Sequence, residues 1–377
     1  MDKTGLLIIG AGTIGRAAAL LAAHHRISAA IFVGDLSPAA AQEAASEARH
    51  VARDGCRVEA FRVQPDALLP PELLARCGVL LDCLPAAEAV GTARLAIEHG
   101  LHYANVTEGV EESEAIASLA SSAGTACVLQ TGVAPGYVNV AALALLDEAR
   151  LRWQVEKVER VEMRVGALPM HAAPPSFYGW TWNPRGVANQ YLRPGVGLRG
   201  GEVTSLPSLA GRRQRVIGGR LLEEAQTAGG AADLPTALQG QVEELDYMTL
   251  RWPGHYEYVE TVLEGAPPDE RLSRLEAAMT RDVPHVDEDL VIVYSAVQGH
   301  DHRGDLRRIE WNGEVRPVDV GGVRLKAIQA TTAGALVEVA RLLFRGRLRG
   351  VVQQATLPRR EFLDGPVVAT VYGPWCA

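Results

Sequence analysis

A loop of glycines near the N-terminus has the spacing of a phosphate-binding turn. Gly10 permits a tight turn, Gly12 lets a pyrophosphate approach the backbone, and Gly15 lets the next helix pack closely on the strand. The apolar run Leu6-Leu7-Ile8-Ile9 precedes the loop and an alanine-rich helical stretch follows it, whose first N–H groups would face the phosphates. The residues expected to contact a dinucleotide here are Gly10, Gly12, Thr13, Ile14 and Gly15.

An acidic residue follows the next apolar run at the distance expected for ribose recognition. Asp35 comes after residues 29–33, about 20 residues beyond the glycine loop, where a carboxylate can accept hydrogen bonds from the adenosine ribose. Its charge would repel a 2′-phosphate, and residues 36–38 provide no arginine to hold one. We therefore expect NAD in preference to NADP. The alternative is a glycine turn in an ordinary α/β protein. However, the strand, the glycine loop, the helix, the second strand and the acidic residue all occur here in the order of a dinucleotide-binding motif.

Other predicted strands of the first third also end in residues that could line a cofactor crevice. Strands are expected at residues 6–9, 29–33, 57–63, 79–81, 103–106 and 126–129, with helices between them. This alternation predicts a parallel sheet, on which ligands bind beyond the carboxyl ends of the strands. The expected lining residues are Cys83, Leu84, Pro85, Asn105, Thr107, Glu108 and Gly132. For residues 83–85, a simple strand-to-helix turn is an equally good interpretation.

Two ionisable residues in the second half could bind and deprotonate a substrate. Arg251 could clamp a carboxylate with two parallel hydrogen bonds, and His255 could move a proton near neutral pH. Both lie in residues 249–257, which we expect to form a polar loop. The alternative is an ordinary Arg–Glu pair and a surface histidine.

Two further segments carry candidate substrate contacts. Residues 132–139 combine Gly and Pro in a sharp corner and place Asn139 in the first turn of the next helix; a domain hinge is the alternative. Residues 178–191 are rich in aromatic groups and include Tyr178 and Thr181, although such residues more often belong to a core. Residues 299–304 superficially resemble a metal site, but the flanking strands indicate a hairpin turn, and we expect no metal.

The fold class follows from a change of pattern near residue 133. Beyond it, strand-like alternation with longer loops predicts a mostly antiparallel α+β domain, and residues 327–343 predict an amphipathic helix that packs back on the first domain. We therefore expect an α/β protein: residues 1–135 form a doubly wound Rossmann domain, residues 136–325 a substrate and oligomerisation domain, and residues 326–377 a returning segment.

Composition excludes several classes of protein. The net charge of −8 and the lack of a Lys/Arg block argue against nucleic-acid binding. The apolar runs look too short or too interrupted to span a bilayer, and the first strand begins too early for a signal peptide. The five cysteines form no CxxC pair, as expected for reduced thiols in a cytoplasmic enzyme.

Several of these segments together resemble the saccharopine dehydrogenase-like family of amino-acid oxidoreductases. The resemblance spans most of the chain. Within this family, the chain is most similar to the lysine 6-dehydrogenase branch. The resemblance is carried by residues 10–15, 81–85, 96–103, 132–136 with Asn139, 183–189 and 251–255. It implies a Rossmann domain, an α+β domain inserted before the last helices, and a homodimer or higher homo-oligomer. The chain departs from the family's pattern at Asn105, where an aspartate is expected, and at residues 170–173.

The resemblance implies an NAD-dependent oxidoreductase acting on the C–N bond of a basic amino acid, with the ε-carbon of L-lysine as the best guess. His255 would be the base, with Glu108 as second choice, and Arg251 would hold the α-carboxylate. The amine would be oriented by Asn139, Tyr178 and Thr181. One alternative is reductive condensation of an amine with a carbonyl compound, with Arg185, Arg193 and Arg199 as candidate extra cations. Another is a non-catalytic NAD-binding regulator.

Overall fold

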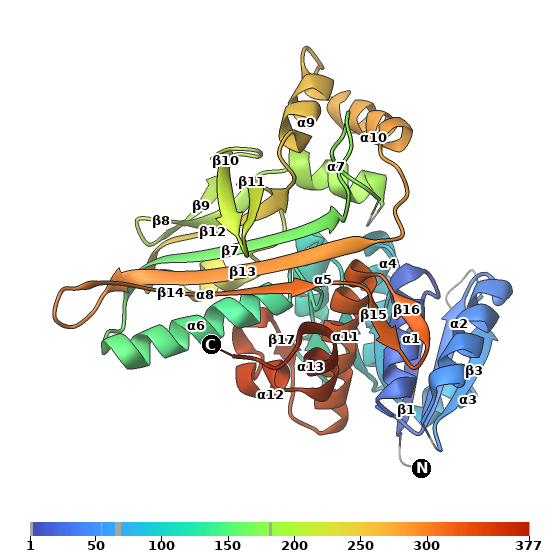
Figure 1. The fold of residues 1–377 in the computed structure, drawn as a ribbon. Helices are drawn as coiled ribbons and strands as arrows, with labels where there is room; N and C mark the ends of the chain where they lie inside the picture. The colour runs from blue at the N-terminus through green and yellow to red at the C-terminus, as the bar shows by residue number, and fades with distance from the viewer. Residues whose placement is uncertain (1–2, 54, 65–68, 181–182, 377) are drawn as a thin grey trace. The chain divides into compact units, whose positions relative to one another are not determined.

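The computed structural model of the chain describes residues 3–53, 55–64, 69–180 and 183–376 (Figure 1). The chain divides into two compact units, which are described separately. Unit 1 runs to Tyr137 and takes up Val318–Leu325 and Gln329–Trp375, whereas unit 2 is built on Val138–Pro317 and Lys326–Ile328. The first boundary thus falls two residues beyond the expected one, and residues 318–325 belong to unit 1 rather than to the substrate domain.

Unit 1 is a parallel sheet with helices. Its strands are β1 (Gly5–Ile9), β2 (Ala30–Asp35), β3 (Arg57–Arg62), β4 (Cys77–Asp82), β5 (His102–Asn105), β6 (Cys127–Val128) and β17 (Val351–Val352), beside a small hairpin of β15 (Val318–Val320) and β16 (Val323–Leu325). Its helices are α1 (Thr13–His24), α2 (Pro38–Val51), α3 (Pro71–Arg76), α4 (Ala86–Glu98), α5 (Val110–Ala120), α11 (Ala327–Phe344), η1 (Gln354–Thr356), α12 (Arg359–Leu363) and α13 (Pro366–Tyr372).

The strand order of unit 1 is that of a dinucleotide-binding fold. It runs β17-β6-β5-β4-β1-β2-β3, with every pairing parallel. The apolar strands are buried along their length, as a sheet covered by helices on both faces requires. The order reverses between β1 and β4, and the crevice at this switch point is where such sheets bind ligands. The expectation of a doubly wound Rossmann sheet is confirmed.

The last part of the chain returns to this sheet, as expected. β17 adds to β6 in parallel, and α11 belongs to unit 1 from Gln329 onward. Contrary to expectation, α11 is long and apolar enough to cross a membrane by length and composition. However, 72% of it is buried inside the chain, as in the core helix of a folded domain.

Unit 2 is a mixed sheet with helices. Its strands are β7 (Val158–Pro169), β8 (Gly195–Arg199), β9 (Glu202–Leu206), β10 (Arg213–Ile217), β11 (Arg220–Gln226), β12 (Val242–Arg251), β13 (Asp289–His300) and β14 (Leu306–Val315). Its helices are α6 (Tyr137–Trp153), α7 (Pro184–Leu192), α8 (Leu234–Ala237), α9 (His255–Leu263) and α10 (Arg271–Asp282).

The main path of this sheet is β10-β11-β12-β7-β13-β14, and β8 and β9 attach beside β12. Only β12 and β7 pair in parallel among the described strands of this sheet; the other pairings are antiparallel, as expected for an α+β domain. α6 lies along one face, and α7, α9 and α10 gather beyond one end of the sheet (Figure 1). Residues 299–304, the predicted turn, comprise the end of β13 and most of its connection to the antiparallel strand β14, which confirms a hairpin.

One sequence prediction about unit 2 is wrong. Residues 249–257 are not a polar loop: Thr249 to Arg251 end the central strand β12, and His255 begins α9. The strand was missed because its buried face carries charge. Asp246 is 3% exposed and pairs with a buried arginine of β7, so apolar and polar residues do not alternate as they do in a half-buried strand.

Candidate active site

The glycine loop between β1 and α1 has the geometry that a dinucleotide requires. Gly10 adopts a φ of +93°, which favours glycine. A Cβ on Gly15 would lie 1.7 Å from the carbonyl oxygen of Gly10, so the helix can pack this close only without a side chain. A Cβ on Gly12 would meet no atom within 4 Å. Gly12 therefore faces open space at the N-terminus of α1, and Gly12 and Thr13 are exposed there. These residues fit a bound pyrophosphate.

Asp35 is held against this loop at the end of β2. Its Oδ2 accepts a hydrogen bond from the Ala11 N–H at 2.7 Å, and its Oδ1 accepts one from the Ser37 N–H at 2.8 Å. The structure also shows a cation that residues 36–38 could not reveal. Arg62, at the end of β3, lies in register beside Asp35 and has no ion pair among the described residues. A search confined to the residues after Asp35 misses it because sheet pairing, not sequence, brings the two together.

The β4–α4 connection lies directly against the glycine loop. The Cys83 N–H donates to the Ile9 carbonyl at 2.9 Å, and a Cβ on Gly10 would lie 2.9 Å from the Cys83 carbonyl oxygen. Leu84 is half-buried, whereas Pro85 is exposed just before the first turn of α4. This placement agrees with a cofactor contact for residues 83–85, which stays a prediction.

The remaining predicted cofactor residues lie at the ends of β5 and β6. Asn105 is 1% exposed and its side chain is bound to other protein groups. Thr107 is buried and its hydroxyl accepts from the Gly109 N–H at 3.3 Å, while Glu108 is half-buried. Gly132 closes a tight turn, since its N–H donates to the Pro135 carbonyl at 2.9 Å. Asn105 and Gly132 thus shape the backbone at these strand ends.

In unit 2, Arg251 is a buried guanidinium that has no acidic partner in the part of the chain that the structure describes. Its Nε donates to the Tyr191 hydroxyl at 2.6 Å and its Nη1 to the Leu250 carbonyl at 2.9 Å. Its side chain lies over the rings of Tyr178 and Tyr191, at 4.8 and 5.5 Å from their centroids. Across the described residues, no carboxylate lies within ion-pair distance. The nearest in register, Glu223, instead accepts from the Tyr256 N–H at 2.7 Å and faces Arg212.

A second buried arginine in the same sheet has its charge fully compensated by carboxylates. Arg164 on β7 is 0% exposed and lies 2.7 Å from Asp246, 2.9 Å from Glu224 and 3.2 Å from Glu162. A buried charge without such partners is costly, because water is removed and nothing replaces it. Arg251 therefore has the electrostatics of a site that receives an anion.

His255 lies beside Arg251 and is fixed in its neutral form. Its Nδ1 lies 2.7 Å from the Ser176 carbonyl, which can only accept, so the ring proton resides on Nδ1. Its Nε2 lies 2.9 Å from the Tyr191 hydroxyl and must then accept from it. Burial and the charge of Arg251 together lower the pKa of His255 to about 3, and burial is the larger cause. The alternative interpretation of a surface histidine is wrong, because His255 is fully buried.

The aromatic segment contributes to the same cluster, and Tyr191 is the member that sequence reasoning did not single out. Tyr178, Trp180 and Tyr191 belong to a buried apolar cluster, as the core interpretation expected, yet the Tyr191 hydroxyl joins Arg251 to His255. Asn139 lies in the first turn of α6, as predicted; it is 0% exposed and its Nδ2 donates to the Gly230 carbonyl at 3.0 Å. Its role toward a substrate amine stays a prediction. Thr181 lies outside the described residues.

The other candidate ligands do not converge. Arg185 pairs with Glu276 at 3.5 Å and Arg199 with Asp246 at 3.2 Å, and no ion pair involves Arg193 among the described residues. Over the same part of the chain, no group of three or more His, Cys, Asp or Glu side chains is arranged to hold a metal ion. Asp301 instead accepts the Arg303 N–H at 2.9 Å in its hairpin turn.

A parallel sheet with this strand order and glycine loop, joined in one chain to a mixed-sheet domain, defines the architecture of a dinucleotide-binding protein. The chain belongs to the saccharopine dehydrogenase family. Residues 6–128 match the saccharopine dehydrogenase NADP-binding domain, and residues 132–364 match the saccharopine dehydrogenase C-terminal domain. It is therefore an enzyme of that family, and unit 1 is its nucleotide-binding domain.

Solved structures share the fold at low sequence identity. Saccharopine dehydrogenase (L-Glu forming) from Saccharomyces cerevisiae has a TM-score of 0.72 at 15% identity, covering 95% of each chain. Homospermidine synthase from Legionella pneumophila, in complex with NAD, has a TM-score of 0.66 at 12% identity, covering 98% of this chain and 90% of that one.

A curated relative matches over a shorter region. Alpha-aminoadipic semialdehyde synthase from Arabidopsis thaliana is 26% identical over 218 residues, 53% of this chain. The match spans 20% of the length of that relative.

Proposed function

We propose that the chain is an NAD-dependent oxidoreductase that acts on the C–N bond of a basic amino acid. The best-fitting reaction is oxidative deamination of L-lysine at its ε-carbon. The bound nicotinamide would accept a hydride from the carbon that bears the amine, while the amine loses a proton. The imine that results then takes up water and releases ammonia, leaving the semialdehyde.

The buried, unpaired guanidinium of Arg251 carries this proposal. No described residue of unit 2 places a negative charge within ion-pair distance of this guanidinium, and an α-carboxylate of the substrate would supply one. The planar guanidinium group can bind a carboxylate through two parallel hydrogen bonds. The two tyrosine rings hold the guanidinium in place before a ligand arrives, which lowers the ordering cost of binding. The compensated Arg164 shows that the fold pairs buried arginines elsewhere in this sheet.

His255 is assigned proton removal through Tyr191, with Glu108 as the second choice. Its Nε2 already accepts the Tyr191 proton, so a proton from the substrate amine would reach the ring by way of that hydroxyl. The charge of Arg251 contributes to the low pKa of His255. A carboxylate on Arg251 would offset this charge and raise the basicity of the imidazole. Tyr178 and Asn139, with Thr181, are assigned to orienting the amine end.

NAD is proposed over NADP because Asp35 places a negative charge beside the glycine loop. The matched family model is described as NADP-binding, and Arg62 in register beside Asp35 provides the competing positive charge. The Asp35 carboxylate accepts hydrogen bonds from two backbone N–H groups, which hold it beside the glycine loop.

Reductive condensation of an amine with a carbonyl compound is the second candidate. It is favoured by the similarity to a saccharopine dehydrogenase and a homospermidine synthase. It would require cations for further carboxylates, and Arg185 and Arg199 already have acidic partners. A non-catalytic NAD-binding regulator would need neither Arg251 nor His255.

We further propose that the chain forms a homo-oligomer, as the resemblance implies, and that it works in the cytoplasm, as its cysteine pattern suggests. The edge hairpin β10–β11 exposes the cross-strand partners Val216 and Leu221 at 66% and 49%, which is an apolar pair suited to an interface between copies. Light scattering of the purified chain tests the assembly, and Val216→Lys should shift it toward smaller species.

The test of the function is a turnover panel with product analysis. The chain is mixed with NAD or NADP and L-lysine, L-ornithine or polyamines, while NADH, ammonia and the product mass are followed. Formation of NADH and ammonia from lysine and NAD, with no keto acid added, supports the proposal. Turnover only with NADH, an amine and a keto acid would assign reductive condensation instead. Binding of NAD without turnover of either kind would leave the regulator.

A further inference from the structure

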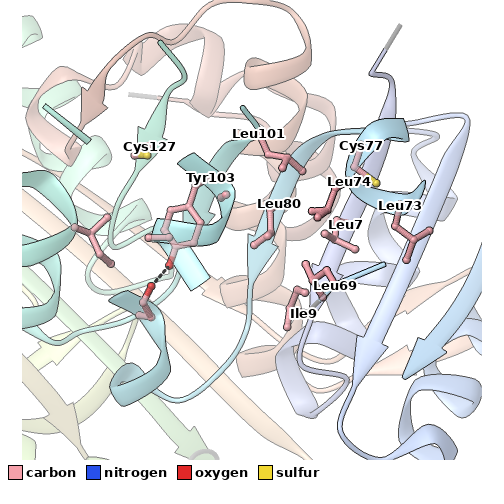
Figure 2. Close-up of a cluster of buried hydrophobic side chains, with 14 of the residues drawn as sticks. Leu7, Ile9, Leu69, Leu73, Leu74, Cys77, Leu80, Leu101, Tyr103 and Cys127 are labelled. Carbon is pink, nitrogen blue, oxygen red and sulfur yellow. Dashed lines mark hydrogen bonds between the residues drawn. The ribbon is translucent and has the colours of Figure 1, made fainter. Parts of the chain in front are cut away.

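Three buried polar side chains form a connected network at the ends of β4 and β5. The Tyr103 hydroxyl donates to Asp82 Oδ2 at 2.7 Å and accepts from Asn105 Nδ2 at 3.2 Å. All three residues are buried. Figure 2 shows Tyr103 among apolar side chains of unit 1 such as Leu80 and Leu101, and these residues belong to one buried hydrophobic cluster that the network borders.

The network extends to the backbone of two loops. Asp82 Oδ1 accepts from the Leu84 N–H at 3.0 Å, in the β4–α4 connection. Asn105 Oδ1 accepts from the Gln130 N–H at 2.9 Å, just after β6. Gln130 adopts a φ of +61°, a conformation that a non-glycine residue takes up only when its surroundings hold it. A continuous chain of hydrogen bonds thus ties one loop to the other.

The network is costly in stability terms. Burial raises the pKa of Asp82 to about 6, although hydrogen bonds from Leu84 and Tyr103 act in the opposite direction. Apolar side chains of similar size would extend the neighbouring cluster without this cost. A function other than stability therefore accounts best for these polar groups.

The place of the network in the fold suggests that function. In this strand order, the adenosine half of a dinucleotide lies over β1 and β2, and the nicotinamide half over β4 to β6. We propose that Tyr103, with Asp82 and Asn105, positions the two loops for the nicotinamide half of the cofactor. These are positioning residues, since their side chains touch protein groups.

The test compares a whole dinucleotide with its adenosine half. Calorimetric titrations of Tyr103→Phe measure the affinity for NADH and for ADP-ribose, which lacks nicotinamide (NADPH and 2′-phospho-ADP-ribose serve if the wild type prefers them). Loss of the hydroxyl should weaken NADH binding about tenfold and change ADP-ribose binding less than about twofold. Tyr372→Phe is the matched control, because it removes another phenol hydroxyl of unit 1, bound to the Thr331 carbonyl at 2.9 Å.

A second pair of variants separates positioning from folding. Asp82→Asn keeps an acceptor for the Leu84 N–H and a polar partner for Tyr103, so it should restore most of the NADH affinity that Asp82→Ala loses. Equal weakening of NADH and ADP-ribose would indicate a general structural role and overturn the inference. Unchanged NADH affinity in Tyr103→Phe would overturn it too, as would a wild-type chain that binds neither dinucleotide.

Discussion

The Nε of Arg251 lies 2.6 Å from the hydroxyl oxygen of Tyr191. This contact fixes the direction of every hydrogen bond that follows. Because Arg251 can only donate, the Tyr191 proton must point to His255, and the remaining imidazole proton must point to the Ser176 carbonyl. The Tyr191 hydroxyl thereby connects the charged guanidinium of Arg251 to the neutral imidazole of His255. A ligand that neutralises the guanidinium should therefore change the basicity of the imidazole.

The buried imidazole predicts a pH dependence of stability. Folding lowers the pKa of His255 from 6.5 to about 3. Between these two pH values, the imidazole is protonated in the unfolded chain and neutral in the folded chain. Its contribution is fully present above pH 6.5 and is lost as the pH falls through the folded pKa. His255→Gln should reduce the rise of unfolding free energy between about pH 4 and 6 by up to ~1.4 kcal/mol per pH unit.

Urea denaturation at several pH values measures this slope. His171→Gln, a change at an exposed histidine of unit 2, is the matched control and should leave the slope as in the wild type. A slope unchanged in His255→Gln would contradict the assignment of a neutral, buried imidazole.

Asp82 predicts a slope of opposite sign. Burial raises its pKa from 3.8 to about 6, so the folded chain holds a proton that the unfolded chain releases. The stability it contributes is fully present below pH 3.8 and is lost as the pH rises through about 6. Asp82→Asn, which carries no titrating group, should make the unfolding free energy fall less steeply over this interval. A steeper fall of the unfolding free energy in the variant would show that the folded chain favours the ionised form of Asp82 and would contradict a raised pKa.

The glycines of the loop predict two different phenotypes. Gly15→Ala places a Cβ 1.7 Å from the Gly10 carbonyl oxygen and should cost about 1–3 kcal/mol of stability or more. Gly12→Ala meets no atom within 4 Å and should change stability by less than about 1 kcal/mol, but it should weaken NADH binding at least about tenfold. Thermal unfolding and calorimetry separate the two. A Gly12→Ala chain that binds NADH normally would contradict the cofactor site.

The sequence predicted unit 1 better than unit 2, for a physical reason. A parallel sheet covered on both faces has continuous apolar strands such as β1, and a glycine loop marks its ligand site. In unit 2, β12 carries Asp246 on a buried face because Arg164 compensates it, so periodicity failed there. Arg251 and His255 could be selected by residue type, whereas their link through Tyr191 depends on the packing of α7 against β12 and α9.

Cofactor preference should follow the opposite charges of Asp35 and Arg62, which lie in register on neighbouring strands. Asp35→Ser keeps an acceptor for the Ala11 N–H but removes the charge, so it should raise the NADP to NAD ratio of kcat/KM about tenfold. Arg62→Ala in the Asp35→Ser background should reverse the gain, because the arginine would then no longer hold the 2′-phosphate. Steady-state kinetics with both cofactors measure this. A ratio that neither change alters would exclude the pair as the determinant.

The most direct test of the central claim compares L-lysine with cadaverine, which is lysine without its carboxylate, in the wild type and in Arg251→Gln. The rate of NADH formation gives kcat/KM for each, and thermal unfolding checks the fold of the variant. If Arg251 binds the α-carboxylate, the variant should lose about 100-fold or more with lysine and less than about threefold with cadaverine. Equal losses with both amines, or a preference for lysine that survives the substitution, would contradict the account.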